Sequence, residues 1–294
     1  MNNFVYSRKQ AIINAFNRAA KSYDDVAFLQ RETAARLISR LDLIKLQPQV
    51  LVDVGAGTGY ATRLLEKHFA KAKIVLIDNA SNMLKQAKRK AKWLTRQCFL
   101  CADACQIPLQ NQTVDFVFSN LMLPWCDEVS TIFQEWLRIL RPGGLLLFST
   151  LGPDTLRELR QSWLAVDEKA HVNQFLDMHD VGDALLRTGF ADPVLDVEHF
   201  TLTFNNALQL MQEIKSMGSN VVRNSGRMTF TGKTRFHNML SQYEKYRTKD
   251  NKIPATVEVV YGHAWVSEST QVSSKGKSEI SVPVAKIIRS HSRG

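Results

Sequence analysis

The stretch LVDVGAGTGY, residues 51–60, decides the fold, because it places an acid and three glycines directly after an apolar run. A strand that ends in a glycine-rich turn and leads into a helix is typical of α/β domains that bind nucleotides. The turn is not a P-loop, which needs GK[ST] after its glycines, since Tyr60 and Ala61 follow Gly59. It also departs from the dinucleotide pattern GxGxxG, because its third glycine comes early and gives GxGxG. Such a turn suits an uncharged ribose and a zwitterionic amino-acid tail better than a diphosphate.

Short apolar runs alternate with amphipathic helical segments after Pro48. This alternation predicts a parallel sheet that is covered by helices on both faces. The fold class that we expect is therefore a doubly wound, Rossmann-like α/β domain. The sequence LRPGG at 140–144 predicts the end of a helix, because proline cannot continue it. The predicted strands are 50–54, 73–78, 97–102, 114–119 and 144–150, and the predicted helices between them are 58–70, 80–92 and 128–140.

The segments outside this alternation predict additions to the domain. Two helices are expected before the sheet, over 7–22 and 26–46, and a third helix over 178–188 ends at Gly189. Strands are expected near 194–204 and 256–266, separated by a polar, basic and helical segment. The resulting division is an N-terminal helical cap at 1–47, a core at 48–204 and 251–266, a helical lid insertion at 205–250 and a flexible basic tail at 267–294.

The charge balance is basic, with 38 lysines and arginines against 28 acids and a formal net charge of +10. Such a surface attracts anionic partners, and nucleic acid, anionic lipid and an acidic carrier protein all qualify. No apolar run reaches the length of about 18 residues that suggests a membrane span. The polar start, MNNFVYSRKQ, lacks the apolar segment of a signal peptide. We therefore expect no membrane span and a cytoplasmic location.

Cys98, Cys101 and Cys105 form a CxxCxxxC pattern that invites a metal interpretation. The spacing reverses the CxxxCxxC of radical enzymes, and no fourth cysteine or close histidine pair completes a zinc site. We expect no metal, and thiols that are buried around one strand.

Polar residues stand at the ends of four successive predicted strands, where ligands of open α/β sheets bind. Asp53 ends the first strand, and its carboxylate would suit a ligand cation such as an ammonium or sulfonium. Asp78 ends the second strand and can accept hydrogen bonds from both hydroxyls of a ribose. Asp103 could accept from an adenine amino group, and Asn120 faces the same crevice. The set points to one cationic nucleoside across the carboxyl edge of the sheet.

This arrangement resembles the class I methyltransferases that use S-adenosylmethionine, over residues 48–150 and the late strand near 256–266. The resemblance implies S-adenosylmethionine as the cofactor and a seven-stranded, mostly parallel sheet whose last strand is antiparallel. It also implies that Gly55 and Gly57 line the methionine moiety, that Asp78 holds ribose, and that Asp103 with Ala104 holds adenine. The full predicted cofactor set is Asp53, Gly55, Ala56, Gly57, Asp78, Asn79, Met83, Asp103, Ala104 and Asn120.

The methyl acceptor must be inferred from segments outside the sheet, because this fold hosts unrelated acceptors. The chain is similar nearly end to end to the malonyl-[acyl-carrier protein] O-methyltransferases of biotin synthesis. That resemblance is carried by FNRAAKSYDDVAFLQ at 16–30, FSNLMLPWCDE at 118–128, STLGPDTLREL at 149–159, HVNQFLDMHDVGDALLRTGFADPVLDVE at 171–198 and KIPATVEVVYGHAW at 252–265. It implies that a malonyl thioester on an acyl-carrier protein is converted to its methyl ester.

The acceptor carboxylate is ionised at neutral pH, so the reaction needs no general base. It needs positioning and the exclusion of water. The family motif places Tyr23 over the cofactor, and Arg223 and Arg227 are the predicted lid arginines that would orient the carboxylate. His171 and His179 are expected to be structural, the latter at a helix start. Five basic lid residues are candidates for docking an acidic carrier protein: Lys215, Arg223, Arg227, Lys233 and Arg235.

Other functions stay open on the sequence alone. PATVEVVYGHAW at 254–265 also resembles a mitochondrial respiratory-complex assembly factor that modifies an arginine of a partner protein, although the chain shows no Arg- and Ser-rich presequence. A nucleic-acid methyltransferase fits the charge, but Asn120-Leu121-Met122-Leu123 cannot form the Asn/Asp-Pro-Pro-aromatic motif of base N-methylation. We therefore expect no nucleic-acid partner. The intact glycine turn and strand-end acids argue against a non-enzymatic binding module.

Overall fold

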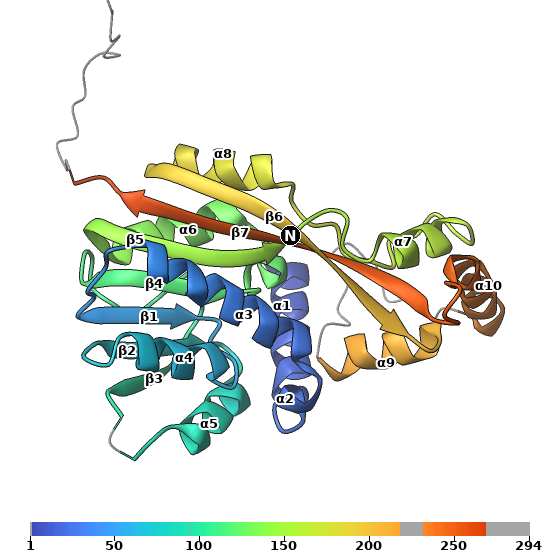
Figure 1. Ribbon diagram of the computed structural model, residues 1–294, viewed down its shortest axis with the longest axis horizontal. Coiled ribbons are helices and arrows are strands. Elements are labelled where there is room, and N and C mark those ends of the chain that lie inside the picture. The colour runs from blue at the N-terminus through green and yellow to red at the C-terminus, as the bar shows by residue number, and fades with distance from the viewer. Residues whose placement is uncertain (1, 94, 218–231, 269–294) are drawn as a thin grey trace, which may run out of the picture.

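The glycine turn follows the first strand of the chain, which lies third in a seven-stranded sheet, in the computed structural model, which describes residues 2–93, 95–217 and 232–268 (Figure 1). The strand order is β3-β2-β1-β4-β5-β7-β6, and β7 is antiparallel to both of its neighbours. The prediction of a doubly wound, mostly parallel sheet with an antiparallel last strand is confirmed. The strands are β1 (Val50–Val54), β2 (Lys73–Asp78), β3 (Gln97–Cys101), β4 (Val114–Asn120), β5 (Leu140–Leu151), β6 (Phe190–Phe204) and β7 (Ile253–Val266).

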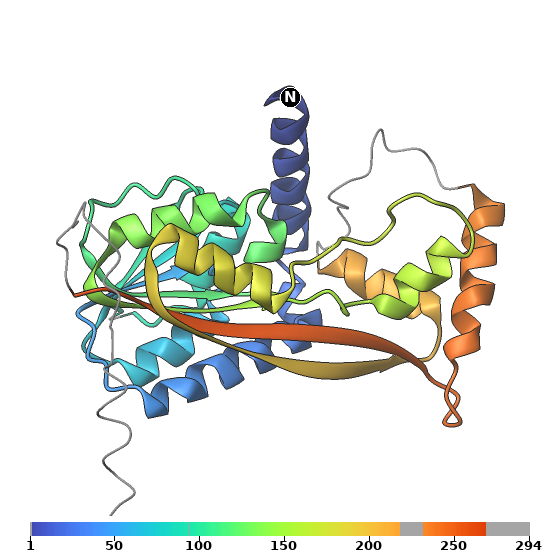
Figure 2. The ribbon, with the colours of Figure 1, turned by 90° about the horizontal axis from the view of Figure 1, so that it is seen from above.

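Helices cover both faces of the sheet because alternate strand residues point to opposite sides. Leu51 of β1 packs in the core beneath α3 (Phe28–Ser39), α4 (Tyr60–His68) and α5 (Ser81–Lys90). Val52 and Val54 point the other way, toward α6 (Val129–Ile139) and α8 (Met178–Thr188). Figure 2 shows α3 and α4 on one side of the sheet and α6 and α8 on the other. This is the two-faced coverage that the continuous apolar strands predict.

The N-terminal segment is helical as expected, but it is divided differently. It forms α1 (Asn2–Ala19), α2 (Tyr23–Val26), α3 and the 3₁₀ helix η1 (Arg40–Leu43). The chain therefore bends around Ser22 and again at Ala27, so that Tyr23 lies in a short helix between the two long ones. The break between the two predicted helices is thus confirmed, but the short helix α2 within it and the end of α3 at Ser39 were not predicted.

Strands β6 and β7 continue past the end of β5 and carry a small second core. Their pairing runs to Phe204 opposite Ile253, whereas β5 pairs only with the later part of β7. Three helices gather at this far end of the ribbon (Figure 1). They are α7 (Arg157–Leu164), which the sequence analysis did not predict, α9 (Ala207–Ser216) and α10 (Lys233–Tyr243), followed by η3 (Glu244–Tyr246). The described part of the 205–250 insertion is thus helical, as expected.

Two smaller expectations differ from the structure. Strand β5 starts at Leu140 rather than at 144, because the chain enters the sheet before Pro142 and a register shift follows. Cys98 and Cys101 are exposed and Cys105 is only half-buried, so the expectation of buried thiols is wrong. The reason is that β3 is an edge strand with little covering it. Among the described residues, no helix has the length and apolar character needed to cross a membrane.

Candidate active site

A cavity of about 820 Å³ opens at the carboxyl ends of β1, β2 and β4. Its size lies within the range of ligand-binding cavities, about 300–1,000 Å³. One part is formed by the glycine turn and the ends of the parallel strands. The other part is formed by α1, α2, the start of α3, α9 and the extended β6–β7 ribbon. The first part is polar and the second is mainly apolar, so two different groups can meet in one cavity.

The glycine turn has a backbone that only glycine adopts readily. Gly55, Gly57 and Gly59 have φ angles of +76°, +55° and +74°. A Cβ atom on Gly55 would lie 2.4 Å from Cγ of Met122, so a side chain cannot be added there without moving the pocket wall. The Gly55 N–H donates to the carbonyl oxygen of Ile77 at 2.8 Å, which holds the turn against β2. Gly55 and Gly57 line the cavity.

Asp78 lies at the end of β2 and joins the turn to the cavity. Its carboxylate accepts hydrogen bonds from the backbone N–H groups of Gly57 and Ala80, both at 2.8 Å. Burial raises the pKa of Asp78 to about 6, although these two hydrogen bonds oppose the rise. The carboxylate oxygens retain lone pairs for further donors from the cavity side. This geometry fits a diol of the ligand.

Asp53 does not face the cavity in which the prediction placed it. Its side chain shares the sheet face with Leu51 and lies beneath α4, where it accepts a hydrogen bond from Thr62. Only 1% of the residue is exposed, and it does not line the cavity. Burial raises the pKa of Asp53 to about 7, a rise that the bond from Thr62 opposes and the charge of Asp78 increases. Ala56 also lies outside the lining, so neither residue is placed to contact a ligand with its side chain.

The remaining predicted cofactor residues line the cavity: Asn79, Met83, Asp103, Ala104 and Asn120. Asp103 forms an ion pair with Lys9 of α1. The Asn120 carboxamide is bonded at both ends, since its Oδ1 accepts from Ser149 at 2.8 Å and its Nδ2 donates to the carbonyl oxygen of Gln30 at 2.9 Å. Asn120 therefore fixes the neighbouring wall.

Tyr23 also lines the cavity, and a set of side-chain bonds holds its helix over the glycine turn. Asp24 accepts hydrogen bonds from Thr58 and Lys90. Burial alone would raise the pKa of Asp24, but these bonds outweigh it and the net pKa is lowered. Burial, followed by the charges of Asp78 and Asp24, raises the pKa of Tyr23 well above its ordinary value. Its hydroxyl is therefore protonated at physiological pH and can donate a hydrogen bond into the cavity.

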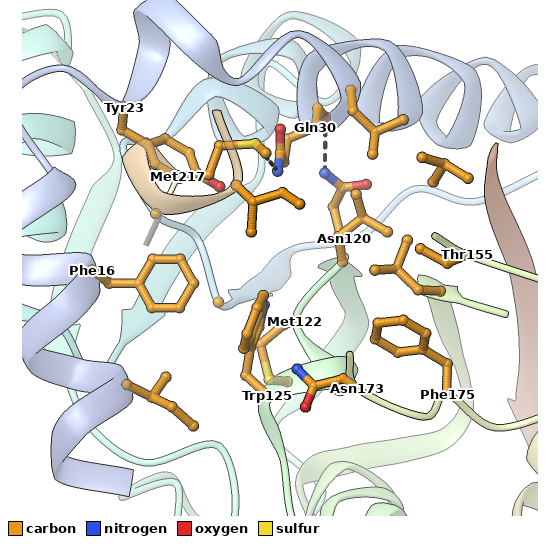
Figure 3. A pocket seen from close by; sticks show the side chains of 18 of the residues that line it. Phe16, Tyr23, Gln30, Asn120, Met122, Trp125, Thr155, Asn173, Phe175 and Met217 are labelled. Carbon is orange, nitrogen blue, oxygen red and sulfur yellow. Dashed lines mark hydrogen bonds between the residues drawn. The ribbon is translucent and has the colours of Figure 1, made fainter. Parts of the chain in front are cut away.

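Several lining residues were not predicted, and Figure 3 shows how they surround the open space. The aromatic rings of Phe16 and Trp125 meet edge to face with centroids 5.3 Å apart. All of the residues listed below except Met217 lie in the stretches that carry the family resemblance, but no spacing or period singles them out within those stretches. The unpredicted residues labelled in the view are Phe16, Gln30, Met122, Trp125, Thr155, Asn173, Phe175 and Met217. The predicted arginines Arg223 and Arg227 lie outside the described residues.

Two bulky lining residues have strained backbones. Leu121 and Leu156 have φ angles of 52° and 56°, a left-handed conformation that costs a non-glycine residue about 1–3 kcal/mol. The Leu121 N–H donates to the carbonyl oxygen of Ser149 at 3.1 Å, and the Leu156 N–H donates to that of Thr256 at 2.7 Å. The strain is thus held by bonds to β5 and β7, at the walls of the cavity.

The two histidines that were expected to be structural have structural contacts. Asp177 caps α8 by accepting from the backbone N–H of His179 at 2.8 Å. His171 stacks on Trp163 with ring centroids 3.8 Å apart and lies 2.8 Å from Asp167.

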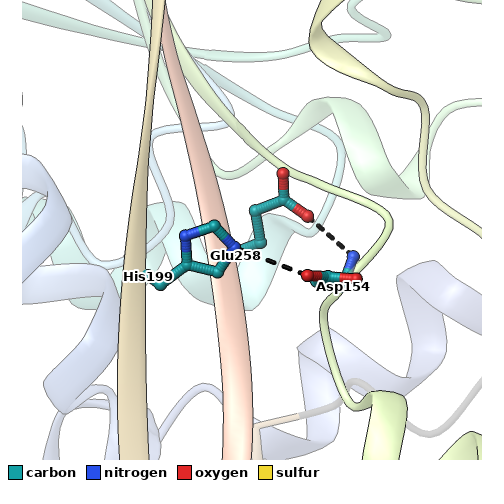
Figure 4. A group of neighbouring side chains, drawn as sticks. All are labelled: Asp154, His199 and Glu258. Atoms are coloured by element: carbon teal, nitrogen blue, oxygen red, sulfur yellow. Dashed lines mark hydrogen bonds and ion pairs between the residues drawn. The ribbon is translucent and has the colours of Figure 1, made fainter.

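One group of described side chains could together hold a metal ion, namely Asp154, His199 and Glu258 (Figure 4). None of the three lines the cavity. The backbone N–H of Asp154 donates to Glu258 at 2.7 Å, and His199 lies 3.6 Å from the Asp154 carboxylate. These contacts tie the loop after β5 to β6 and β7, which accounts for the group without an ion.

Comparison with known sequences identifies close relatives. The family model described as "Methyltransferase domain" matches residues 52–148. The chain is 45% identical over 271 residues to the malonyl-[acyl-carrier protein] O-methyltransferase of Gallionella capsiferriformans, and the match covers 90% of this chain and 93% of the relative. It is 40% identical to malonyl-[acyl-carrier protein] O-methyltransferase 1 of Coxiella burnetii, with 96% of each chain covered.

Comparison with solved structures supports the fold. A putative methyltransferase from Bacillus halodurans matches 80% of this chain and 99% of its own, with a TM-score of 0.56 at 16% identity. Phosphoethanolamine N-methyltransferase 2 of Haemonchus contortus, solved with S-adenosyl-L-methionine, matches 85% of this chain and 57% of its own, with a TM-score of 0.53 at 18% identity. At such identities the likeness shows the methyltransferase fold alone.

Proposed function

This chain belongs to the malonyl-[acyl-carrier protein] O-methyltransferase family, and we propose that it uses S-adenosylmethionine to methylate the free carboxylate of malonyl-acyl-carrier protein, an early step of biotin synthesis. The observation that carries this proposal is the cavity, in which a polar cofactor half adjoins an apolar half that is closed by Tyr23 and α9. S-adenosylmethionine, when bound, supplies a methyl group on a sulfonium centre. The products would be a methyl ester and S-adenosylhomocysteine, because the methyl–sulfur bond breaks as the oxygen–methyl bond forms.

The cofactor residues would act through shape and hydrogen bonds. Asp78 would accept from the ribose hydroxyls, and Gly55 and Gly57 allow the close approach of the methionine moiety. Asp103 and Ala104 lie at the part of the cavity that would hold adenine. No phosphate-binding lysine or metal is required, which agrees with the absence of a P-loop sequence.

The substrate half would act by positioning. The malonyl carboxylate is ionised at neutral pH, so no side chain has to remove a proton from it. The sulfonium cation and the carboxylate anion neutralise each other as the transition state forms. A strongly charged group bound to the carboxylate would therefore stabilise the reactants more than the transition state. Tyr23 would hold this end of the cavity with a neutral donor, and the apolar walls would exclude water. Arg223 and Arg227 stay candidates for orienting the carboxylate.

We further propose that the 205–250 insertion is a lid on which an acidic carrier protein docks. Lys233 and Arg235 of α10 are exposed, and Lys215 of α9 reaches the cavity lining. Their charges would attract an acidic partner to the mouth of the pocket.

The proposal predicts methyl transfer that depends on a free carboxylate. Labelled S-adenosylmethionine should transfer its label to malonyl-acyl-carrier protein as a base-labile ester. Acetyl-acyl-carrier protein, which lacks the carboxylate, should stay unlabelled under the same conditions. Cofactor binding without transfer to the malonyl carrier would contradict the proposal and favour a protein-modifying methyltransferase.

The pKa of Asp78 predicts how cofactor affinity changes with pH. The carboxyl must be ionised to accept from both hydroxyls, and burial raises its pKa to about 6 in the free protein. When the pH is below this pKa, the Asp78 carboxyl group must therefore lose its proton before the cofactor binds. We expect the Kd for S-adenosylmethionine to be nearly constant above pH 7 and to rise about tenfold for each pH unit below 6. Calorimetric titrations from pH 5 to 8 measure this, and a flat profile would exclude Asp78 as an ionised acceptor.

A further inference from the structure

Gln30 places a carboxamide with unused hydrogen-bonding capacity in the wall of the cavity. It lies in the first turn of α3, beside Tyr23, Asn120 and Met217 (Figure 3). Its Oε1 is buried and has no hydrogen-bond partner among the described residues. Its Nε2 donates to Sδ of Met217 at 3.4 Å, and a thioether sulfur is a weak acceptor. The two N–H hydrogens of Nε2 thus have one weak acceptor between them, and they retain capacity for a stronger acceptor from the cavity.

The backbone of Gln30 is held firmly, although its side chain is not. The carbonyl oxygen of Gln30 accepts from Nδ2 of Asn120, whose other end is bonded to Ser149. The start of α3 is therefore fixed to the end of β4, next to the cofactor half of the cavity. The carboxamide itself can rotate about its last torsion, which has a broad twofold potential, and can turn either end toward a ligand.

On these observations, and resting on the proposed function, we infer that the Gln30 carboxamide binds the malonyl carboxylate and positions it for methylation. The N–H group donates to a carboxylate oxygen in place of the Met217 sulfur. An amide carries no net charge, so it orients the anion without neutralising it, as a reaction that loses charge requires. Tyr23, the neighbouring neutral donor, complements this function from α2.

A charged rival is present on the same side of the cavity. Lys215 of α9 lines the pocket near Met217 and could instead hold the carboxylate by charge. Lys9, another lining cation, forms an ion pair with Asp103. The two possibilities, a neutral amide and a lysine, differ in which substitution removes recognition of the malonyl group.

The test compares Gln30→Met with Lys215→Met, and uses Gln10→Met as a matched glutamine control. Gln10 lies on the exposed side of α1 and does not line the cavity. Affinity for malonyl- and acetyl-acyl-carrier protein is measured with bound S-adenosylhomocysteine, so that no turnover occurs. Gln30→Met should bind malonyl-acyl-carrier protein about 10- to 100-fold more weakly, because it loses a hydrogen bond to a charged group. Its affinity for acetyl-acyl-carrier protein should stay unchanged. S-adenosylhomocysteine affinity should also stay unchanged, which shows that the fold is intact.

Turnover gives a second readout. The kcat of Gln30→Met with malonyl-acyl-carrier protein should fall by about the same factor or more, since the carboxylate is no longer oriented. Gln30→Glu should be at least as impaired, because it puts a like charge beside the carboxylate and keeps the side-chain length. The inference would be overturned if Gln30→Met still preferred the malonyl carrier over the acetyl carrier as strongly as the unsubstituted protein does. It would also be overturned if only Lys215→Met lost this preference. If the unsubstituted protein does not methylate the malonyl carrier, the proposed function itself fails, whatever the variants do.

Discussion

Replacement of Asp78 by asparagine is expected to weaken S-adenosylmethionine binding about 100-fold or more. Two hydrogen bonds from ribose hydroxyls to a charged acceptor contribute about 1.5 kcal/mol or more each. The asparagine also breaks the turn, because its NH₂ group would face a backbone N–H of Gly57 or Ala80 that now donates to the carboxylate. Isothermal titration calorimetry of the purified variant measures the loss directly.

The control for this prediction is Asp42→Asn. Asp42 lies in η1, its side chain is 72% exposed, and it does not line the cavity. Its loss should leave the Kd unchanged. In Asp78→Asn the dependence of any residual affinity on pH below 6 should also disappear, because the titrating carboxyl is gone. A Kd within about threefold of the unsubstituted protein would show that Asp78 does not hold the ribose, since such a change is under 1 kcal/mol.

Replacement of Trp136 by alanine is expected to lower the free energy of unfolding by about 3–5 kcal/mol, the usual cost of deleting a large buried aromatic side chain. Trp136 lies on α6 and is fully buried among residues of β4, β5 and α8. It meets Phe133 edge to face with ring centroids 5.8 Å apart. Its removal leaves a cavity between the helices and the sheet that cannot collapse without moving both. Urea denaturation followed by circular dichroism gives the change.

The same substitution at Trp93 is the matched control. That residue is 99% exposed, and surface changes are usually within about 0.5 kcal/mol. Equal losses in the two variants would contradict the burial on which this prediction depends.

The two halves of the cavity differ in how far the sequence predicted them. Asp78, Asp103 and Asn120 were identified because the carboxyl ends of parallel strands meet at one edge of the sheet. The position of a polar residue at a strand end is then enough to predict that it lies at this edge. Asp53 satisfied the same rule but points beneath α4, since strand alternation turns its side chain away from the cavity. Gln30, Phe16 and Trp125 follow no local pattern. These three residues come from segments that are far apart in the chain, and only the folded structure brings them into one wall of the cavity.

The sequence by itself determined the parallel part of the sheet and the glycine turn. These depend on short-range features, namely the period of apolar residues, the glycines and the strand-end acids. The antiparallel last strand and the family were implied by the resemblance of whole stretches of the chain to known proteins. Only the tertiary structure decided the direction of Asp53, the short helix that presents Tyr23, the exposure of the β3 cysteines and the position of Gln30. Each of these depends on contacts between residues far apart in the chain. Periodicity carries no information about such contacts, because packing and hydrogen bonding across elements determine them.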